Sequence, residues 1–160
     1  MCDCMTKKRK TCLIILLMLV ISWTAVIFMQ SAKSGIESTD DTKKLIRIIE
    51  NVASKIGLEI EVQPHFLRKL AHFLEYAVLG FSAAIFVMGF GKKSLLLAPF
   101  GYSVVVALAD EFIVQRLAEG RGPGFVDVVI DSAGAATAIF AVLGLWLWHD
   151  AIARKKGEPC

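Results

Sequence analysis

Ionisable residues open an apolar run in the stretch from Arg68 to Tyr76 (RKLAHFLEY), and the run continues to Phe90. At about 100° per residue, Arg68, His72 and Glu75 fall within a narrow angular band of a helix. An imidazole beside a carboxylate could act as a base or nucleophile, and a guanidinium could hold a phosphate. These residues alone do not name a reaction.

Two more polar clusters follow at helical spacing. Glu111 and Gln115 are one turn apart, with Asp110 to one side, and Asp127 and Asp131 are also one turn apart. Each cluster stands at one end of an apolar stretch. The elements that position them must therefore be apolar helices.

The segment between these clusters reads Gly-Arg-Gly-Pro-Gly at positions 120–124. Its glycines permit unusual backbone angles, so its amides and Arg121 could turn toward an anion. It also fits a tight turn that needs glycine at positive φ. Taken alone, the turn is the better interpretation.

The composition indicates an integral membrane protein. The chain has 160 residues, of which 56% are hydrophobic and 21% charged, and its mean hydropathy is +0.60. A membrane helix needs roughly 20 mainly apolar residues. We therefore predict an all-α membrane protein with four transmembrane helices, at about 13–29, 69–90, 95–114 and 125–148. The net charge of +3 is too small to indicate nucleic-acid binding.

Between spans one and two, apolar residues recur at helical spacing from about Thr42 to Ile56. This pattern predicts an amphipathic extracytoplasmic helix ended by Gly57, which either packs across the spans or lies in the headgroup layer over a site. Residues 58–62 predict a short extended piece, and Pro64 suits the first turn of the next helix.

Basic residues predict the topology. Lys7-Lys8-Arg9-Lys10, Lys92-Lys93 and Arg154-Lys155-Lys156 all reach one side if both termini are cytoplasmic. We read the first span as an uncleaved anchor because it is long and lacks a convincing cleavage site. The predicted organisation is a cytoplasmic N-terminus (1–12), a single membrane domain (13–149) and a cytoplasmic basic tail (150–160).

The four cysteines agree with this topology. Cys2, Cys4 and Cys160 fall on the cytoplasmic side and Cys12 at the membrane edge. No disulfide is expected. The Cys2-Asp3-Cys4 motif has no histidine or second cysteine pair nearby, so we do not expect a metal there.

The same topology places the three polar clusters at one depth, in the outer half of the bundle. An isolated charge at such depth costs a few kcal/mol even on the lenient insertion scale, so these groups should be paired and face inward. They form either a structural ion-pair network or a binding or catalytic site.

Taken in order, the motifs resemble those of the VanZ-like family, which is named for a protein associated with low-level resistance to the glycopeptide teicoplanin. The resemblance rests on RKxxHFxEY at 68–76, DExxxQ at 110–115, GR at 120–121 and DxxxDxxG at 127–134, and it covers about 30–142. Asp131 stands where the family usually has asparagine, and Gln30-Ser31 matches a serine-containing segment loosely. The resemblance implies a small multi-pass protein of the bacterial plasma membrane.

Two functions remain open. In an enzyme acting on a phosphorylated or lipid-linked envelope substrate, His72 would be the base or nucleophile, Glu75 or Asp110 would orient its ring, and Arg68 and Arg121 would hold a phosphate. In a binding protein, the same network would dock an envelope component. We favour binding, because no nucleophile motif is unambiguous.

Further expectations concern ligands. The remaining ligand-binding candidates are Glu111, Gln115, Asp127 and Asp131. A divalent metal on His72, Glu75 and the aspartates is conceivable, but two arginines nearby argue against it, so we expect no metal and no other cofactor. The expected partners are membrane lipids and a phosphorylated or lipid-linked envelope ligand. The oligomeric state stays open.

Overall fold

The computed structural model describes residues 7–33, 35–90, 97–118 and 124–155, and in these ranges every regular element is a helix. The elements are α1 (Lys7–Ser31), α2 (Gly35–Lys55), α3 (Pro64–Met88), α4 (Leu97–Ala109), the π-helix η2 (Asp110–Val114), α5 (Gln115–Leu117) and α6 (Phe125–Lys155).

Four helical segments are long and apolar enough to cross a membrane: α1, α3, the continuous run from Leu97 to Leu117, and α6. The predicted all-α membrane architecture with four spans is confirmed. The helices extend beyond the apolar stretches, because α1 begins at Lys7 and α6 continues to Lys155. Hydrophobicity limits only the part of a helix that can lie in hydrocarbon, whereas backbone hydrogen bonds continue into the headgroup region.

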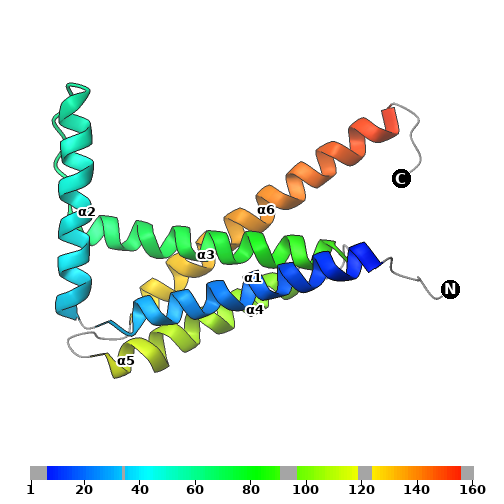
Figure 1. Ribbon diagram of the computed structural model, residues 1–160, viewed down its shortest axis with the longest axis horizontal. Coiled ribbons are helices and arrows are strands. Elements are labelled where there is room, and N and C mark those ends of the chain that lie inside the picture. Colours follow the sequence, from blue (N-terminus) through cyan, green and yellow to red (C-terminus); the bar gives the residue numbers. More distant parts are fainter. Residues whose placement is uncertain (1–6, 34, 91–96, 119–123, 156–160) are drawn as a thin grey trace.

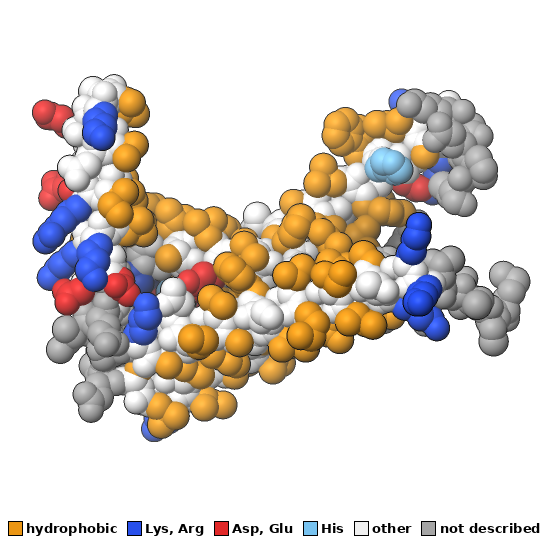
Figure 2. Space-filling model, in the orientation of Figure 1, with side chains coloured by type: hydrophobic (Ala, Val, Ile, Leu, Met, Phe, Trp, Pro, Cys, Tyr) orange, Lys and Arg blue, Asp and Glu red, His pale blue; other side chains and the backbone are white. Residues whose placement is uncertain are grey.

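Helices α1, α3 and α4 run side by side, and α6 crosses them obliquely (Figure 1). The start of α1 and the end of α6 lie toward one end of the bundle, and α2 lies across the other end. Lysine and arginine side chains gather at both ends, with a hydrophobic belt between them (Figure 2). This distribution is the one expected of a protein that spans a bilayer.

Helix α2 is amphipathic, as predicted, but begins at Gly35 rather than near Thr42. Its buried residues are Ile46 and Ala53. Gly57 follows with φ of +79°, a left-handed conformation that glycine adopts without strain. The six residues after it, 58–63, carry no regular structure.

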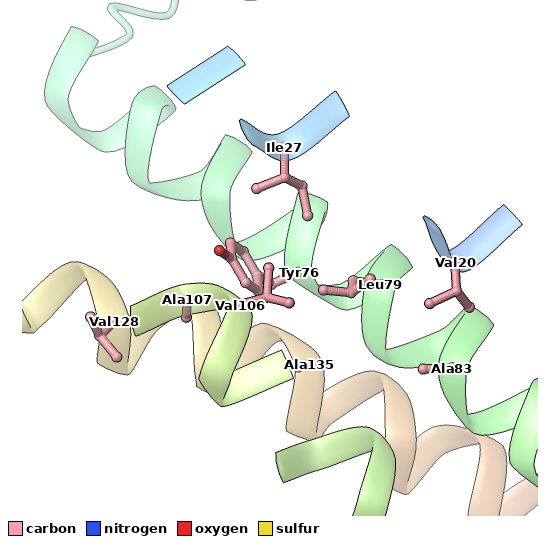
Figure 3. Packing of buried hydrophobic residues seen from close by; sticks show 9 residues of the cluster. All are labelled: Val20, Ile27, Tyr76, Leu79, Ala83, Val106, Ala107, Val128 and Ala135. Carbon is pink, nitrogen blue, oxygen red and sulfur yellow. The ribbon is translucent and has the colours of Figure 1, made fainter. Parts of the chain in front are cut away.

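The core is built largely from small and branched residues, which lets the helices approach closely (Figure 3). Tyr76, Leu79 and Ala135 are fully buried at its centre. Helix α1 is tied to α3 along its length: Arg9 donates to the Gly89 carbonyl at 2.9 Å, and Trp23 Nε1 donates to the Glu75 carbonyl at 2.8 Å. These ties fix the register of the helices that carry the polar residues.

Candidate functional site

A buried polar cluster lies at the end of the bundle that α2 covers. His72 comes from α3, Asp110 from η2 and Asp131 from α6, and a potential ligand atom of each lies within 4.8 Å of the others. Asp110 and Asp131 have no exposed surface. Three spans that are distant in sequence therefore place an imidazole and two carboxyl groups in one small region.

Glycines set the contact between α3 and α6. A Cβ added to Gly134 would collide with the Phe73 carbonyl oxygen, and one added to Gly80 would lie 2.6 Å from the Ala135 carbonyl oxygen. The two helices cross almost backbone to backbone, as small residues permit inside membranes. Phe73 follows His72, and Gly134 lies one turn after Asp131, so this crossing brings His72 Nδ1 to 3.8 Å from Asp131 Oδ1.

The π-helix η2 arranges the polar residues of the third span. Its wider turn places Asp110 and Gln115, five residues apart, on one side, and both are buried together with Glu111. Gln115 Nε2 donates to Asp110 Oδ2 at 3.3 Å and to Glu111 Oε2 at 2.5 Å. The amide thus bridges the carboxyl groups of two adjacent residues.

Hydrogen bonds from other elements complete the support of these carboxyl groups. The Ser31 hydroxyl, at the end of α1, donates to Asp110 Oδ2 at 2.8 Å. The Gly124 backbone N–H, just before α6, donates to Glu111 Oε1 at 2.5 Å. Each of these carboxyl groups is therefore fixed by a donor from another segment, which limits their freedom to reorient.

Asp131 is supported differently. Neither of its carboxyl oxygens has a hydrogen-bond partner among the residues that the structure describes, although both oxygens are buried. The same holds for the hydroxyl of Tyr76 within the described ranges. Buried polar atoms are nearly always satisfied, so these groups are candidates for contact with a ligand or with residues outside the described ranges.

A cavity of about 200 Å³ adjoins the cluster, between the end of α1, α2 and the start of α3. Ser31 and His72 line it, and so do Arg68, Glu75 and Leu67. The cavity therefore shares His72 with the buried cluster, and Ser31, which donates to Asp110, also lies on its wall. A molecule bound there would meet His72 and Arg68 together.

Charged side chains near this cavity differ in their pairing. Lys33 Nζ lies 2.8 Å from Asp41 Oδ2, and through this hydrogen bond and its charge Lys33 holds the pKa of the Asp41 carboxyl below its ordinary value. Lys69 Nζ lies 3.9 Å from Asp127 Oδ1. No ion pair within 4 Å is formed by Arg68 with any other described residue. Arg68 is thus the basic group on the cavity wall with charge to offer a ligand.

The structure gathers most of the residues that the sequence singled out. His72, Asp110, Glu111, Gln115 and Asp131 meet in the buried cluster. Arg68 and Glu75 line the cavity, and Asp127 is half-exposed beside Lys69. Arg121 lies outside the described residues, and so do Lys92 and Lys93.

Two contributors escaped the sequence analysis. Ser31 was noted only for a loose family match, yet it ends α1 and binds Asp110. Tyr76 was part of the central stretch without a role, and it is fully buried beside the cluster. In the sequence, Ser31 stands out as a hydroxyl residue at the end of an apolar run. Its partner Asp110 lies 79 residues further along the chain, so local spacing could not predict the contact.

Comparison with known proteins adds one finding. The family model described as VanZ/LLP1 matches residues 14–148, which is most of the chain. No curated protein and no solved structure shows significant similarity.

Proposed function

Because the chain belongs to the VanZ/LLP1 family, we propose that it is a bacterial plasma-membrane protein that binds an envelope component in the cavity beside His72. By this binding it contributes to resistance to glycopeptides such as teicoplanin. The partners are membrane lipids and a phosphorylated or lipid-linked envelope molecule.

The observation that carries this proposal is the position of Arg68 on the wall of the cavity. Its guanidinium forms no ion pair with the other described residues, and His72 lies in the same cavity. A guanidinium binds phosphate through two parallel hydrogen bonds. Leu45, Leu67 and Ala71 also line the cavity, so an anionic group with an apolar attachment fits its lining.

The orientation is part of the proposal. Four spans return the chain to its starting side, and basic residues flank the start of α1 and the end of α6. Both termini are then cytoplasmic, and the cavity faces the outer surface, where α2 covers it. A site on that side meets envelope components without transport across the membrane.

A second function is supported by the contact of His72 with Asp131. His72 lies on the edge of the cavity with Asp131 Oδ1 at 3.8 Å from its Nδ1, so a small side-chain rotation would let this carboxylate orient the ring of a general base or nucleophile. In this alternative the protein cleaves or transfers a phosphorylated or lipid-linked substrate.

The test compares Arg68→Gln with Arg47→Gln. Arg47 is an exposed arginine of α2 and does not line the cavity, so it serves as the matched control. We expect Arg68→Gln to abolish the increase in the inhibitory concentration of teicoplanin without lowering the amount of membrane-inserted protein. Arg47→Gln should keep both. Full resistance with Arg68→Gln, or a loss that only follows the protein level, would refute the proposal.

Residues that act as one unit should also lose function non-additively. His72→Gln and Arg121→Gln should each abolish the phenotype, and the double variant should be no worse than either. The enzyme alternative requires in addition that purified wild-type protein releases phosphate or another product from envelope lipids and that His72→Gln does not.

A further inference from the structure

We propose that His72, Asp110 and Asp131 form a binding site for a single divalent transition-metal cation, of the Zn²⁺ or Mn²⁺ type. The inference is independent of the proposed function, because a metal can occupy this cluster whether or not the cavity binds an envelope molecule.

The separations of the donor atoms fit this site. Two atoms bound tetrahedrally to one Zn²⁺ at about 2.05 Å lie about 3.4 Å apart. His72 Nδ1 and Asp131 Oδ1 lie 3.8 Å apart, which is too long for a hydrogen bond and close to this value. All three donors lie within 4.8 Å of one another, so each pair needs to shorten by at most about 1.4 Å. Rotation of the side chains covers such a distance.

The environment of Asp131 supports the metal site independently of the donor distances. Its side chain is completely buried, and neither oxygen has a hydrogen-bond partner among the described residues. Removing an ion from water without such partners is costly. A metal ion on the same side as His72 would satisfy the carboxylate directly, since buried charges are paired or coordinate metals.

The carboxyl group of Asp110 is oriented by hydrogen bonds, as the carboxyl groups of metal ligands usually are. Its Oδ2 accepts hydrogen bonds from Ser31 at 2.8 Å and from Gln115 at 3.3 Å. Ligating carboxylates are typically held by such outer partners, which fix the direction of the remaining oxygen. The π-helix is what makes this arrangement available, because it places Gln115 beside Asp110.

The local charge also favours a cation. The carboxyl groups of Glu75, Asp110, Glu111 and Asp127 all lie within electrostatic range of Asp131. Of the basic side chains that the structure describes on α3, Arg68 lies near Glu111 and Lys69 lies 3.9 Å from Asp127. Arg68 lines the cavity and Lys69 faces Asp127, whereas the side chain that faces Asp131 is the imidazole of His72. A divalent cation held by Asp110 and Asp131 would offset negative charge at two carboxyl groups that are completely buried.

The donor set decides the class of metal. Imidazole suits zinc, iron, copper and nickel, whereas carboxylates alone suit magnesium, calcium and manganese. One nitrogen and two oxygens therefore select a borderline metal such as Zn²⁺ or Mn²⁺. Three protein ligands leave a further position for water or a ligand.

The experiment uses the full chain in detergent, purified without a histidine tag, with the four cysteines changed to serine so that thiolates cannot bind. The protein is stripped with a chelator and then titrated separately with Zn²⁺ and Mn²⁺. Bound metal and melting temperature are measured. We expect saturation at a single cation per chain and a rise of about 5–10 °C at a hundredfold excess over Kd.

Variants of the ligands and a matched control decide the assignment. His72→Gln and Asp131→Asn should each weaken binding more than about a hundredfold, and Ser31→Ala about tenfold. His149→Gln, an exposed histidine at the far end of α6, should bind as the parent does. Absence of saturable binding of either cation, or parent-like binding by Asp131→Asn, would overturn the proposal.

The melting temperature of the metal-free protein distinguishes loss of metal binding from loss of folding. Asp131→Asn removes a buried charge, so in the metal-free state it should melt at least as high as its parent. If His72 and Asp131 instead form a structural ion pair, the same variant should melt well below the metal-free parent, because it removes the negative charge that faces His72. That result would also overturn the proposal.

Discussion

Replacing Gly134 by alanine tests the helix crossing that assembles the polar cluster. The added Cβ would collide with the Phe73 carbonyl oxygen and would lie 3.0 Å from the Phe73 carbonyl carbon and 3.2 Å from its Cα. The obstacle is backbone, which cannot rotate away as a side chain can. Helices α3 and α6 must therefore separate at this point.

Gly144 provides the matched control on the same helix. A Cβ added there meets nothing within 4 Å. Both substitutions gain the same intrinsic helix preference of about 1 kcal/mol for alanine over glycine. That gain cancels when the two variants are compared, so their difference reports the cost of overpacking alone.

Overpacking of a well-packed interface costs typically about 1–3 kcal/mol. For a chain of 160 residues, a difference of about 2 kcal/mol corresponds to about 4–8 °C in Tm. We expect Gly134→Ala to melt lower than Gly144→Ala by this amount, followed by tryptophan fluorescence of the protein in detergent. Gly80→Ala, whose Cβ would lie 2.6 Å from the Ala135 carbonyl oxygen, should behave like Gly134→Ala.

Equal melting temperatures for the position-134 and position-144 variants would refute the reasoning. The two helices would then not be in backbone contact, and the approach of His72 to Asp131 would need another cause. A lower Tm for the control alone would contradict the open space around Gly144 in the same way.

Two other predictions concern the amide of Gln115 and the proposed topology. Gln115→Leu removes the amide that donates to Asp110 and Glu111, so it should lower the free energy of unfolding by about 1–3 kcal/mol. The control Gln63→Leu, at an exposed position, should leave the free energy of unfolding unchanged. Equal stability of the two variants in denaturant titrations would mean that the amide bridge contributes nothing to stability. For the topology, single cysteines at Ser38 and Ser94 in a cysteine-free background should react differently with an impermeant thiol reagent on intact cells. Position 38 should be labelled and position 94 spared, and the opposite pattern would place the cluster in the inner leaflet.

The sequence alone was sufficient for the membrane architecture. The thickness of hydrocarbon sets a minimum length of apolar helix, so four long apolar runs predict four spans without knowledge of their neighbours. Helical period also predicted which side of a span is polar, as for Arg68, His72 and Glu75. These properties depend on residues close in sequence, which is why they could be read directly.

The start of α2 shows where such local reading ends. The apolar period begins near Thr42, but the helix begins at Gly35, because backbone hydrogen bonds can continue through residues outside the apolar period. The π-helix at Asp110–Val114 was likewise not predicted from the sequence. Its wide turn is stabilised by contacts of Gln115 with two carboxyl groups and by a serine from another helix, none of which a local pattern contains.

Which polar residues meet was decided only by the tertiary structure. The sequence put the clusters at one depth, but depth does not determine partners around a bundle. The partner of His72 depends on the crossing of α3 and α6, which in turn depends on two glycines that allow backbone contact. Asp110 likewise receives one of its hydrogen bonds from Ser31, at the end of α1. Helical period sets the direction of a side chain relative to its own axis, whereas the packing of neighbouring helices sets what that side chain meets.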